Sequence, residues 1–340
     1  MAHTRDVLWI AWLIALGTVG CEDEISGPRA PDEGLTLAAA GDFSIWSPAL
    51  NIEGAPPGAD PNFNTPGLEG CPFISPDGKT FYMASIRMDD PAYMGGIDIY
   101  VSTRGGVNEP WGEPVNVGPP VNSAADDFCP TIARDGHTLY FVSRRQEGVQ
   151  GVDWCGGADI YVTRLRGDKG FEEPRNLGCQ LNSPQEEFSP FPLNERGSGP
   201  VLYFSSTRPG LGAGGDLYRS ESQGGVFRPA QLVPGVNSTS DDGQPNLRHD
   251  GLELFFYSNR PDDGAQGGND IYVATRPSTR DPWSIPVNLG SNVNSSASET
   301  RPSLSWDGTN LYFGSNRPAS EGVPPSSDIY VTTRERLRGN

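Results

Sequence analysis

The sequence predicts an all-β fold: a five-bladed β-propeller of four-stranded antiparallel blades, closed by an N-terminal strand that completes the last blade. Three observations predict it. A short aromatic strand occurs five times, the repeats recur every 54 to 61 residues, and turn-forming residues are abundant. The 340 residues include 43 glycines and 32 prolines, which suits many short strands joined by turns rather than a helical bundle. A repeat of this length fits one four-stranded unit.

Each repeat contains two adjacent strands with a fixed pattern. The first is a continuous aromatic run, typical of a strand covered on both faces, and its copies begin at Phe81, Leu139, Leu202, Leu254 and Leu311. The second has the form Asp-Ile-Tyr-Val or a close variant, and its copies begin at Asp98, Asp159, Asp216, Asp270 and Asp328. Four repeats carry Asp-Gly just before the aromatic strand, which predicts a tight hairpin turn there.

The outermost strand predicts how the ring closes. This strand begins with an aromatic residue and ends in asparagine, as in Trp111 to Asn116, but the fifth repeat lacks it. The same step occurs near the N-terminus, from Trp46 to Asn51. We therefore expect this segment to complete the last sheet, in a propeller that spans residues 42–334 and is followed by a tail, 335–340. Ring closure removes the open seam that a linear solenoid has to cap.

One repeat resembles a known family. The stretch Ser-Pro-Asp-Gly-Lys-Thr-Phe-Tyr at 75–82, followed by Gly-Gly-Ile-Asp-Ile-Tyr-Val at 95–101, is similar to the WD40-like β-propeller repeat of TolB-type proteins. The resemblance covers all five repeats. It implies the propeller fold and an exported protein that acts as a scaffold or binding module. It does not name the ligand, because one fold hosts many functions.

The N-terminal segment, residues 1–21, resembles a bacterial lipoprotein signal peptide. Arg5 precedes an apolar run from Val7 to Leu16, which is too short to span a bilayer but suits the core of a signal. Small residues then lead to Cys21, which would be acylated after cleavage; an ordinary secretory signal is the alternative. Residues 22–41 are predicted to be a flexible tether. We expect an exported, lipid-anchored protein of the bacterial cell envelope, at the outer membrane.

The other four cysteines predict disulfide bonds, because an even number of cysteines in an exported chain is typical of them. Cys155 ends a loop and Cys179 follows the last strand of the same blade, so we predict a bridge between them. Cys71 and Cys129 occupy matching places in adjacent blades and form the second predicted pair. Their spacing, with no histidine nearby, does not predict a zinc site.

An arginine follows the aromatic strand of every repeat, and an aspartate opens the strand beside it. We predict five structural ion pairs that hold the intervening loops: Arg87–Asp98, Arg144–Asp159, Arg208–Asp216, Arg260–Asp270 and Arg317–Asp328. An anion site is the alternative, but fivefold repetition favours the structural role. A partly exposed pair of this kind contributes roughly 0–1 kcal/mol.

A second set of repeated acids lies three residues before a proline of each repeat, at Glu69, Asp127, Glu187, Asp242 and Glu299. They either cap turn amides or converge on the channel, where they would bind a cation or a basic group. A structural calcium ion held by acids such as Asp241, Asp242 and Asp263 is one such cation; no other cofactor is expected. Residues that interrupt the repeat are better ligand candidates. Trp154 and Tyr93 lie on loops, where an aromatic ring can stack on a sugar or anchor a protein.

The charge and the residue inventory narrow the function. The net charge of −18 argues against a nucleic-acid partner. His137 and His249 sit in or beside Asp-Gly turns, so a Ser-His-Asp triad is poorly supported. We predict a non-enzymatic lipoprotein that binds a protein or glycan partner of the envelope through its loop face and meets the membrane through its lipid anchor alone. The alternative is a glycoside hydrolase that uses central carboxylates such as Asp127 and Glu187, because two carboxylates suffice for that reaction.

Overall fold

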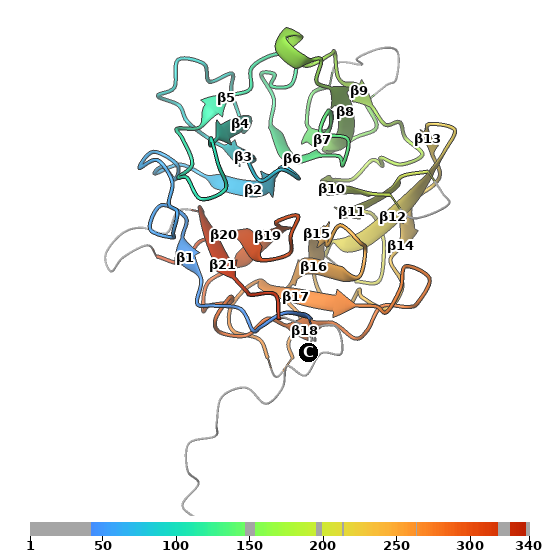
Figure 1. Cartoon of the computed structure of the whole chain (residues 1–340). Coiled ribbons are helices and arrows are strands. Elements are labelled where there is room, and N and C mark those ends of the chain that lie inside the picture. Colours follow the sequence, from blue (N-terminus) through green and yellow to red (C-terminus); the bar gives the residue numbers. More distant parts are fainter. Residues whose placement is uncertain are drawn as a thin grey trace, which may run out of the picture. The chain divides into compact units, whose positions relative to one another are not determined.

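The computed structural model describes residues 42–146, 154–194, 199–212, 214–262, 264–318 and 327–337. The predicted signal peptide with Cys21, the predicted tether, Asp263 and the last three residues of the predicted tail lie outside the described residues. Within the described ranges, five antiparallel sheets surround a central axis, as Figure 1 shows. The predicted five-bladed β-propeller is therefore confirmed. No helix in these ranges is long and apolar enough to cross a membrane.

Each blade begins with its innermost strand and proceeds outward in chain order. Blade one consists of β2 (Glu69–Ile74), β3 (Thr80–Ser85), β4 (Asp98–Thr103) and β5 (Val115–Asn116). Blade two consists of β6 (Asp127–Ile132), β7 (Thr138–Ser143), β8 (Asp159–Arg164) and β9 (Arg175–Asn176), with a short 3₁₀ helix, η3 (Gly167–Lys169), before β9. Blade three consists of β10 (Glu187–Leu193), β11 (Val201–Ser206), β12 (Asp216–Gln223) and β14 (Gln231–Leu232), and β13 (Val226–Phe227) extends the end of β12.

Blade four consists of β15 (Asp242–Leu247), β16 (Glu253–Ser258), β17 (Asp270–Thr275) and β18 (Val287–Asn288). Blade five consists of β19 (Glu299–Leu304), β20 (Asn310–Ser315), β21 (Asp328–Thr333) and, as its outermost strand, β1 (Leu50–Asn51). The innermost strands β2, β6, β10, β15 and β19 follow one another around the axis.

The N-terminal strand closes the ring as predicted. In β1, Leu50 lies opposite Val331 and Asn51 lies opposite Tyr330 of β21. The closure also involves the segment before β1, because Trp46 is buried and its ring lies 6.2 Å from that of Phe255 in blade four. Opening the ring would therefore expose a strand edge and an aromatic contact at once.

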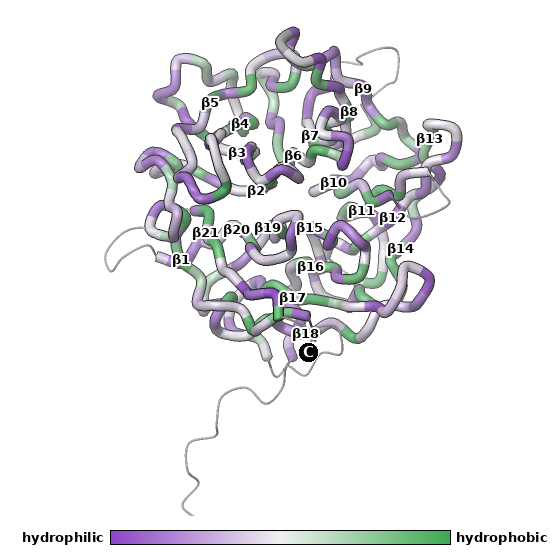
Figure 2. The backbone as a smooth tube through the Cα atoms, viewed as in Figure 1, coloured by the Kyte–Doolittle hydropathy of each residue, from purple (hydrophilic) through white to green (hydrophobic). Residues whose placement is uncertain are grey.

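The core lies between neighbouring sheets. The aromatic strand of each blade is almost wholly buried, as its continuous apolar run predicts. Phe81 shows the packing: its ring lies 5.2 Å from that of Phe63, 5.3 Å from Trp111 and 5.2 Å from Tyr312 of the adjacent blade. In Figure 2, hydrophobic stretches follow the strands and hydrophilic residues are common in the loops.

Every innermost strand carries a bulge at the same place. The residue before the bulge proline has a positive φ, between 47° and 57°, in all five blades: Cys71, Cys129, Ser189, Gln244 and Arg301. Residues other than glycine rarely adopt a positive φ. Its occurrence at the same place in all five blades therefore shows that the blade architecture imposes it. Four of these residues, all but Gln244, line a cavity in the central channel. The bulge is thus the device that sets the channel lining.

Candidate functional site

The five repeated acids occupy the same place in every blade, at the start of the innermost strand, and all are fully buried. Glu187 is typical: it accepts hydrogen bonds from the amide and hydroxyl of Ser183, from the hydroxyl of Ser206, and from Arg208 at 2.8 Å. The acids Glu69, Asp127, Glu187, Asp242 and Glu299 pair in turn with Arg87, Arg145, Arg208, Arg260 and Arg317. Each acid therefore caps a turn and ties it to an arginine of its own blade.

Burial raises the pKa of the Glu69 and Glu187 carboxyls, while hydrogen bonds from Thr65 and Ser183 and the nearby arginines oppose that shift. None of the five acids lines the cavities described below. Among the described residues, no group of three or more histidine, cysteine, aspartate or glutamate side chains could hold a metal ion.

The predicted partners of the repeated arginines were wrong. Among the described residues the structure does not form Arg87–Asp98, Arg144–Asp159, Arg208–Asp216, Arg260–Asp270 or Arg317–Asp328. Four of these arginines turn inward to the buried acids, and Arg144 binds Asp126 and Glu186 instead. A neighbouring serine sets the direction of the arginine side chain: Nε of Arg208, for example, donates to the hydroxyl of Ser206, two residues earlier. In blade two the equivalent residue is Arg145, while Arg144 is exposed and bridges Asp126 and Glu186.

The aspartates that open the third strands have a different task. Asp98 accepts hydrogen bonds from the amide of Met94 at 2.7 Å and from the side chain of Asn116 at 2.8 Å. Asp159 is held in the same way by Cys155 and Asn176. These aspartates therefore fix their own loop to the outermost strand.

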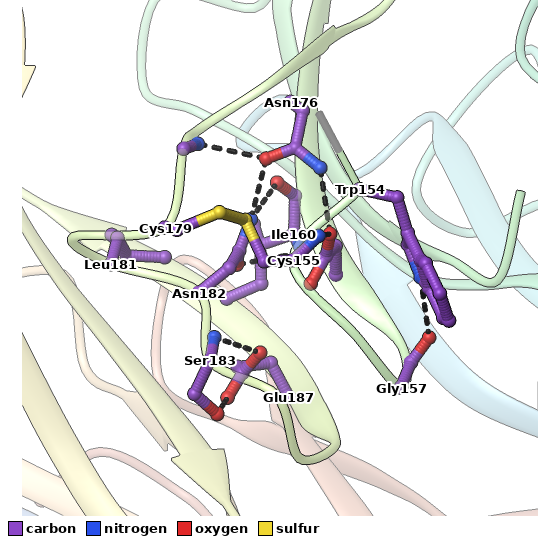
Figure 3. The surroundings of a disulfide bond; sticks show 12 residues. Trp154, Cys155, Gly157, Ile160, Asn176, Cys179, Leu181, Asn182, Ser183 and Glu187 are labelled. Carbon is purple, nitrogen blue, oxygen red and sulfur yellow. Dashed lines mark hydrogen bonds between the residues drawn. A yellow bond between two sulfur atoms is a disulfide. The ribbon is translucent and has the colours of Figure 1, made fainter. Parts of the chain in front are cut away.

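Both predicted disulfide bonds are present. Cys155 joins Cys179 and thereby links the loop before β8 to the segment after β9, as Figure 3 shows. Beside this bond, Asn182 donates to the carbonyl of Ile160 and accepts from its amide. Cys71 joins Cys129 across the bulges of two adjacent innermost strands, so the second bridge lies in the channel wall.

The two aromatic candidates are tied to their own loops. The indole nitrogen of Trp154 donates to the carbonyl of Gly157 at 3.1 Å, and Figure 3 shows the ring directed away from the disulfide. The hydroxyl of Tyr93 donates to the carbonyl of Gly96 at 2.8 Å. Trp154 keeps 40% of its surface exposed, so its ring remains accessible. Neither residue lines a cavity described here.

The cavity that the sequence analysis missed lies at the other end of the channel, beside the Asp-Gly turns. We call it the mouth pocket. Its walls are apolar, with Phe73 and Phe191 among them, and its polar residues include Arg134, Asn194 and His249. Trp306 completes it. Among the described residues, the lining contains no aspartate or glutamate.

The mouth pocket is built from positions at which the blades differ. The residue just before the Asp-Gly turn is Pro76, Arg134, His249 or Trp306 in the four blades that keep this turn. The His249 and Trp306 rings stack, with centroids 4.8 Å apart and planes 25° apart. Arg134 belongs to blade two, which is not a neighbour of blade five, yet its guanidinium carbon lies 5.7 Å from the Trp306 ring centre. Arg134 and Trp306 therefore face one another across the mouth.

Two further cavities lie among the described residues. One lies deeper in the channel and shares Phe73 and Thr131 with the mouth pocket. The other is an open hollow in blade one, and Asp89, Asp90 and Glu113 belong to its lining.

No model of a known protein family matches this chain, and no curated protein does. Solved structures do. The α-L-arabinofuranosidase of Podospora anserina, in complex with cellotriose, is 12% identical with a TM-score of 0.53, over 87% of this chain and 98% of that chain. The α-L-arabinofuranosidase of Lactobacillus brevis is 15% identical with a TM-score of 0.52, over 81% and 94%. These likenesses show the β-propeller fold alone.

A TolB-type structure from Agrobacterium tumefaciens is 15% identical over 88% of this chain and 100% of that chain. Its TM-score of 0.45 does not place this chain in the TolB-type family. The function has to be argued from the cavities themselves.

Proposed function

We propose that this chain is a carbohydrate-binding β-propeller of the bacterial cell envelope, anchored through a lipid on Cys21, which holds a glycan in the mouth pocket without hydrolysing it. The observation that carries the proposal is the pocket lining: an aromatic ring, Trp306, lies beside hydrogen-bonding side chains in an apolar cavity. Sugars present apolar ring faces rimmed by hydroxyls, and an indole beside polar groups complements both.

The arrangement around Trp306 supports this assignment. His249 stacks on the indole and holds its plane, and Arg134 and Asn194 supply donors at the rim. Both Arg134 and His249 are exposed, so a ligand can reach them from solvent. Binding proceeds on the face of the Asp-Gly turns rather than on the loop face that the sequence favours.

Two tryptophans on opposite faces give a matched test. Purified full-length protein is screened on a glycan array, and the affinity for the best ligand is measured by calorimetry. Trp306→Ala should weaken binding by about tenfold or more, because a stacked ring contributes on the order of 1–3 kcal/mol at such a site. Trp154→Ala should leave the affinity unchanged. Loss of binding in Trp154→Ala alone would move the site to the loop face, and an empty array would reject the proposal.

Hydrolysis of a glycan is the second candidate function. It is favoured by the fold shared with two arabinofuranosidases and by the open hollow that contains Asp89, Asp90 and Glu113. The buried acids Asp127 and Glu187 already bind arginines, so the hollow is the better place for two working carboxylates. Turnover of chromogenic glycosides that Glu113→Gln abolishes, and Arg134→Gln does not, would establish hydrolysis instead.

A further inference from the structure

The central channel differs in charge from the molecule as a whole. The chain has a net charge of −18, which makes carboxylates the commonest charged groups on it. Among the described residues, the linings of the mouth pocket and of the deeper channel cavity nevertheless contain no aspartate or glutamate, and they do contain Arg134 and Arg301. In the described part of this acidic chain, the channel cavities are thus lined by cations and not by carboxylates.

Arg301 differs from the other arginines of the blade interiors. Those that follow the aromatic strands pair with the buried acids, and Arg248 and Arg334 pair with Glu253. For Arg301 the structure contains no ion pair among the described residues. Its Nε atom is buried and has no hydrogen-bond partner in that part of the chain. One donor of the guanidinium is therefore buried without a partner among these residues, while the side chain as a whole is only partly buried.

The fold holds Arg301 in this place. Its φ of 57° puts it at the bulge of β19, and its amide donates to the side-chain oxygen of Gln244 at 3.0 Å. Gly70 on the neighbouring strand gives the guanidinium its space, because a Cβ atom there would lie 2.8 Å from Nη1 of Arg301. Ser189 and Asn246 contribute further polar side chains to the same cavity.

An unpaired charge in this setting is costly. Burial lowers the pKa of Arg301, which reports the same loss of water that makes an isolated cation unfavourable inside a protein. A bound anion would restore the lost interactions, and arginine prefers carboxylate or phosphate oxygens. Because Arg301 is only partly buried, an anionic group of a ligand can reach it at this cavity.

We propose that Arg301 binds a carboxylate of the ligand, so that the glycan taken up by the channel is acidic and contains uronic acid residues. This inference rests on the proposed function, because the mouth pocket supplies the sugar contact. Trp306 follows Arg301 by five residues, a separation of at most roughly 16 Å at 3.3 Å per residue. Both residues therefore lie within the reach of one short oligosaccharide.

The test compares an acidic oligosaccharide with its neutral twin. The probes are a trimer of galacturonic acid and the same trimer with its carboxylates methyl-esterified, titrated into full-length protein by calorimetry. Wild-type protein should bind the acidic trimer more tightly. Arg301→Gln should weaken the acidic trimer by about tenfold to a hundredfold and leave the esterified trimer unchanged, because a charged hydrogen-bonded pair is lost. Arg301→Lys should recover part of the affinity.

Controls separate the charge effect from misfolding. Arg144→Gln removes an exposed arginine outside the channel and should leave both affinities unchanged. Arg301→Gln should melt no lower than wild type, since it removes a cation that has no ion pair among the described residues. Equal losses for both trimers in Arg301→Gln would overturn the inference. So would an Arg301-dependent rise in melting temperature with inorganic phosphate but none with the acidic trimer, which would make the channel a site for a free anion.

The outcomes also distinguish this inference from the proposed function. One outcome is that wild-type protein binds the esterified trimer as tightly as the acidic one while Trp306→Ala weakens the binding of both trimers. That result would support the glycan site at the mouth pocket and reject the carboxylate site at Arg301. If Trp306→Ala changes neither affinity, the proposed function itself fails.

Discussion

Arg334 donates hydrogen bonds to both carboxylate oxygens of Glu253, at 3.0 and 2.6 Å, and so joins residues 81 positions apart in the chain. The guanidinium carbon of Arg334 also lies 4.5 Å from the Trp46 ring centre and 3.9 Å from that of Phe43. A single side chain after β21 thus binds blade four and the N-terminal closing segment together. The seam of the ring is held by charge and aromatic contacts as well as by β1.

Glu253→Gln should destabilise the protein strongly. The carboxylate is buried and faces two cations, Arg248 at 3.1 Å and Arg334 at 2.6 Å; its neutralisation removes the counter-charge of Arg334 and leaves Arg248 with Asp250 alone. Breaking a buried pair of this kind costs about 3–5 kcal/mol. Urea unfolding followed by tryptophan fluorescence would measure the loss. Glu221→Gln is the matched control, because the Arg219–Glu221 pair is largely exposed and should contribute less than about 1 kcal/mol.

The blades and their closure could be predicted because they repeat. A buried aromatic strand, an Asp-Gly turn and a strand that starts with aspartate recur in register, and the displaced copy at Trp46 to Asn51 marks the seam. The Cys71–Cys129 pairing followed from equivalent positions in adjacent blades, and the Cys155–Cys179 pairing from a loop and a strand end of one blade. The strand order and the ring closure could therefore be predicted from the repeat.

The side-chain partners could not be predicted in the same way. Sequence proximity across the loop suggested Arg208–Asp216, but serine two residues before the arginine directs the guanidinium inward to Glu187. The bulge that turns Arg301 toward the channel is a register shift within β19, and its only marker in the sequence is the proline that follows, Pro302. The mouth pocket was missed because the Asp-Gly turns were considered only as turns. The informative signal was the variable residue before them.

Removal of the Cys155–Cys179 bridge should weaken blade two without abolishing the fold. The bridge closes a loop with a sequence separation of 24 residues, and loops of that order give about 3 kcal/mol through the unfolded state. The double variant Cys155→Ser, Cys179→Ser should therefore unfold at lower denaturant than wild type. Chemical denaturation with and without reductant would show it: the reductant should shift the wild type by more than the double variant. Equal shifts would contradict the assignment.

Asp77→Asn should cost stability at neutral pH and little in acid. The hydroxyl of Ser75 and the amide of Lys79 donate to this carboxylate and lower the pKa of Asp77. A depressed pKa stabilises the folded protein above the unfolded value, about 4 for aspartate, and this contribution is lost as pH falls through the folded pKa. The melting temperature of the variant should lie below wild type at pH 7, and the gap should narrow toward about pH 3. A gap that is independent of pH would show that the charge is not the cause.

Asp98→Asn should show the opposite trend with pH. Burial raises the pKa of Asp98, against hydrogen bonds from Met94 and Asn116, and its second oxygen has no hydrogen-bond partner among the described residues. A raised carboxyl pKa means that the folded protein loses stability as pH rises from about 4 through the folded pKa. Asparagine keeps an oxygen for the Met94 and Asn116 donors but carries no charge. The variant therefore does not lose stability through ionisation at this position as the pH rises. Its melting temperature relative to wild type should therefore rise between about pH 3.5 and pH 7, as measured by differential scanning calorimetry. A relative melting temperature that falls over the same interval would contradict this, because it would mean that the charged carboxylate of Asp98 stabilises the folded protein.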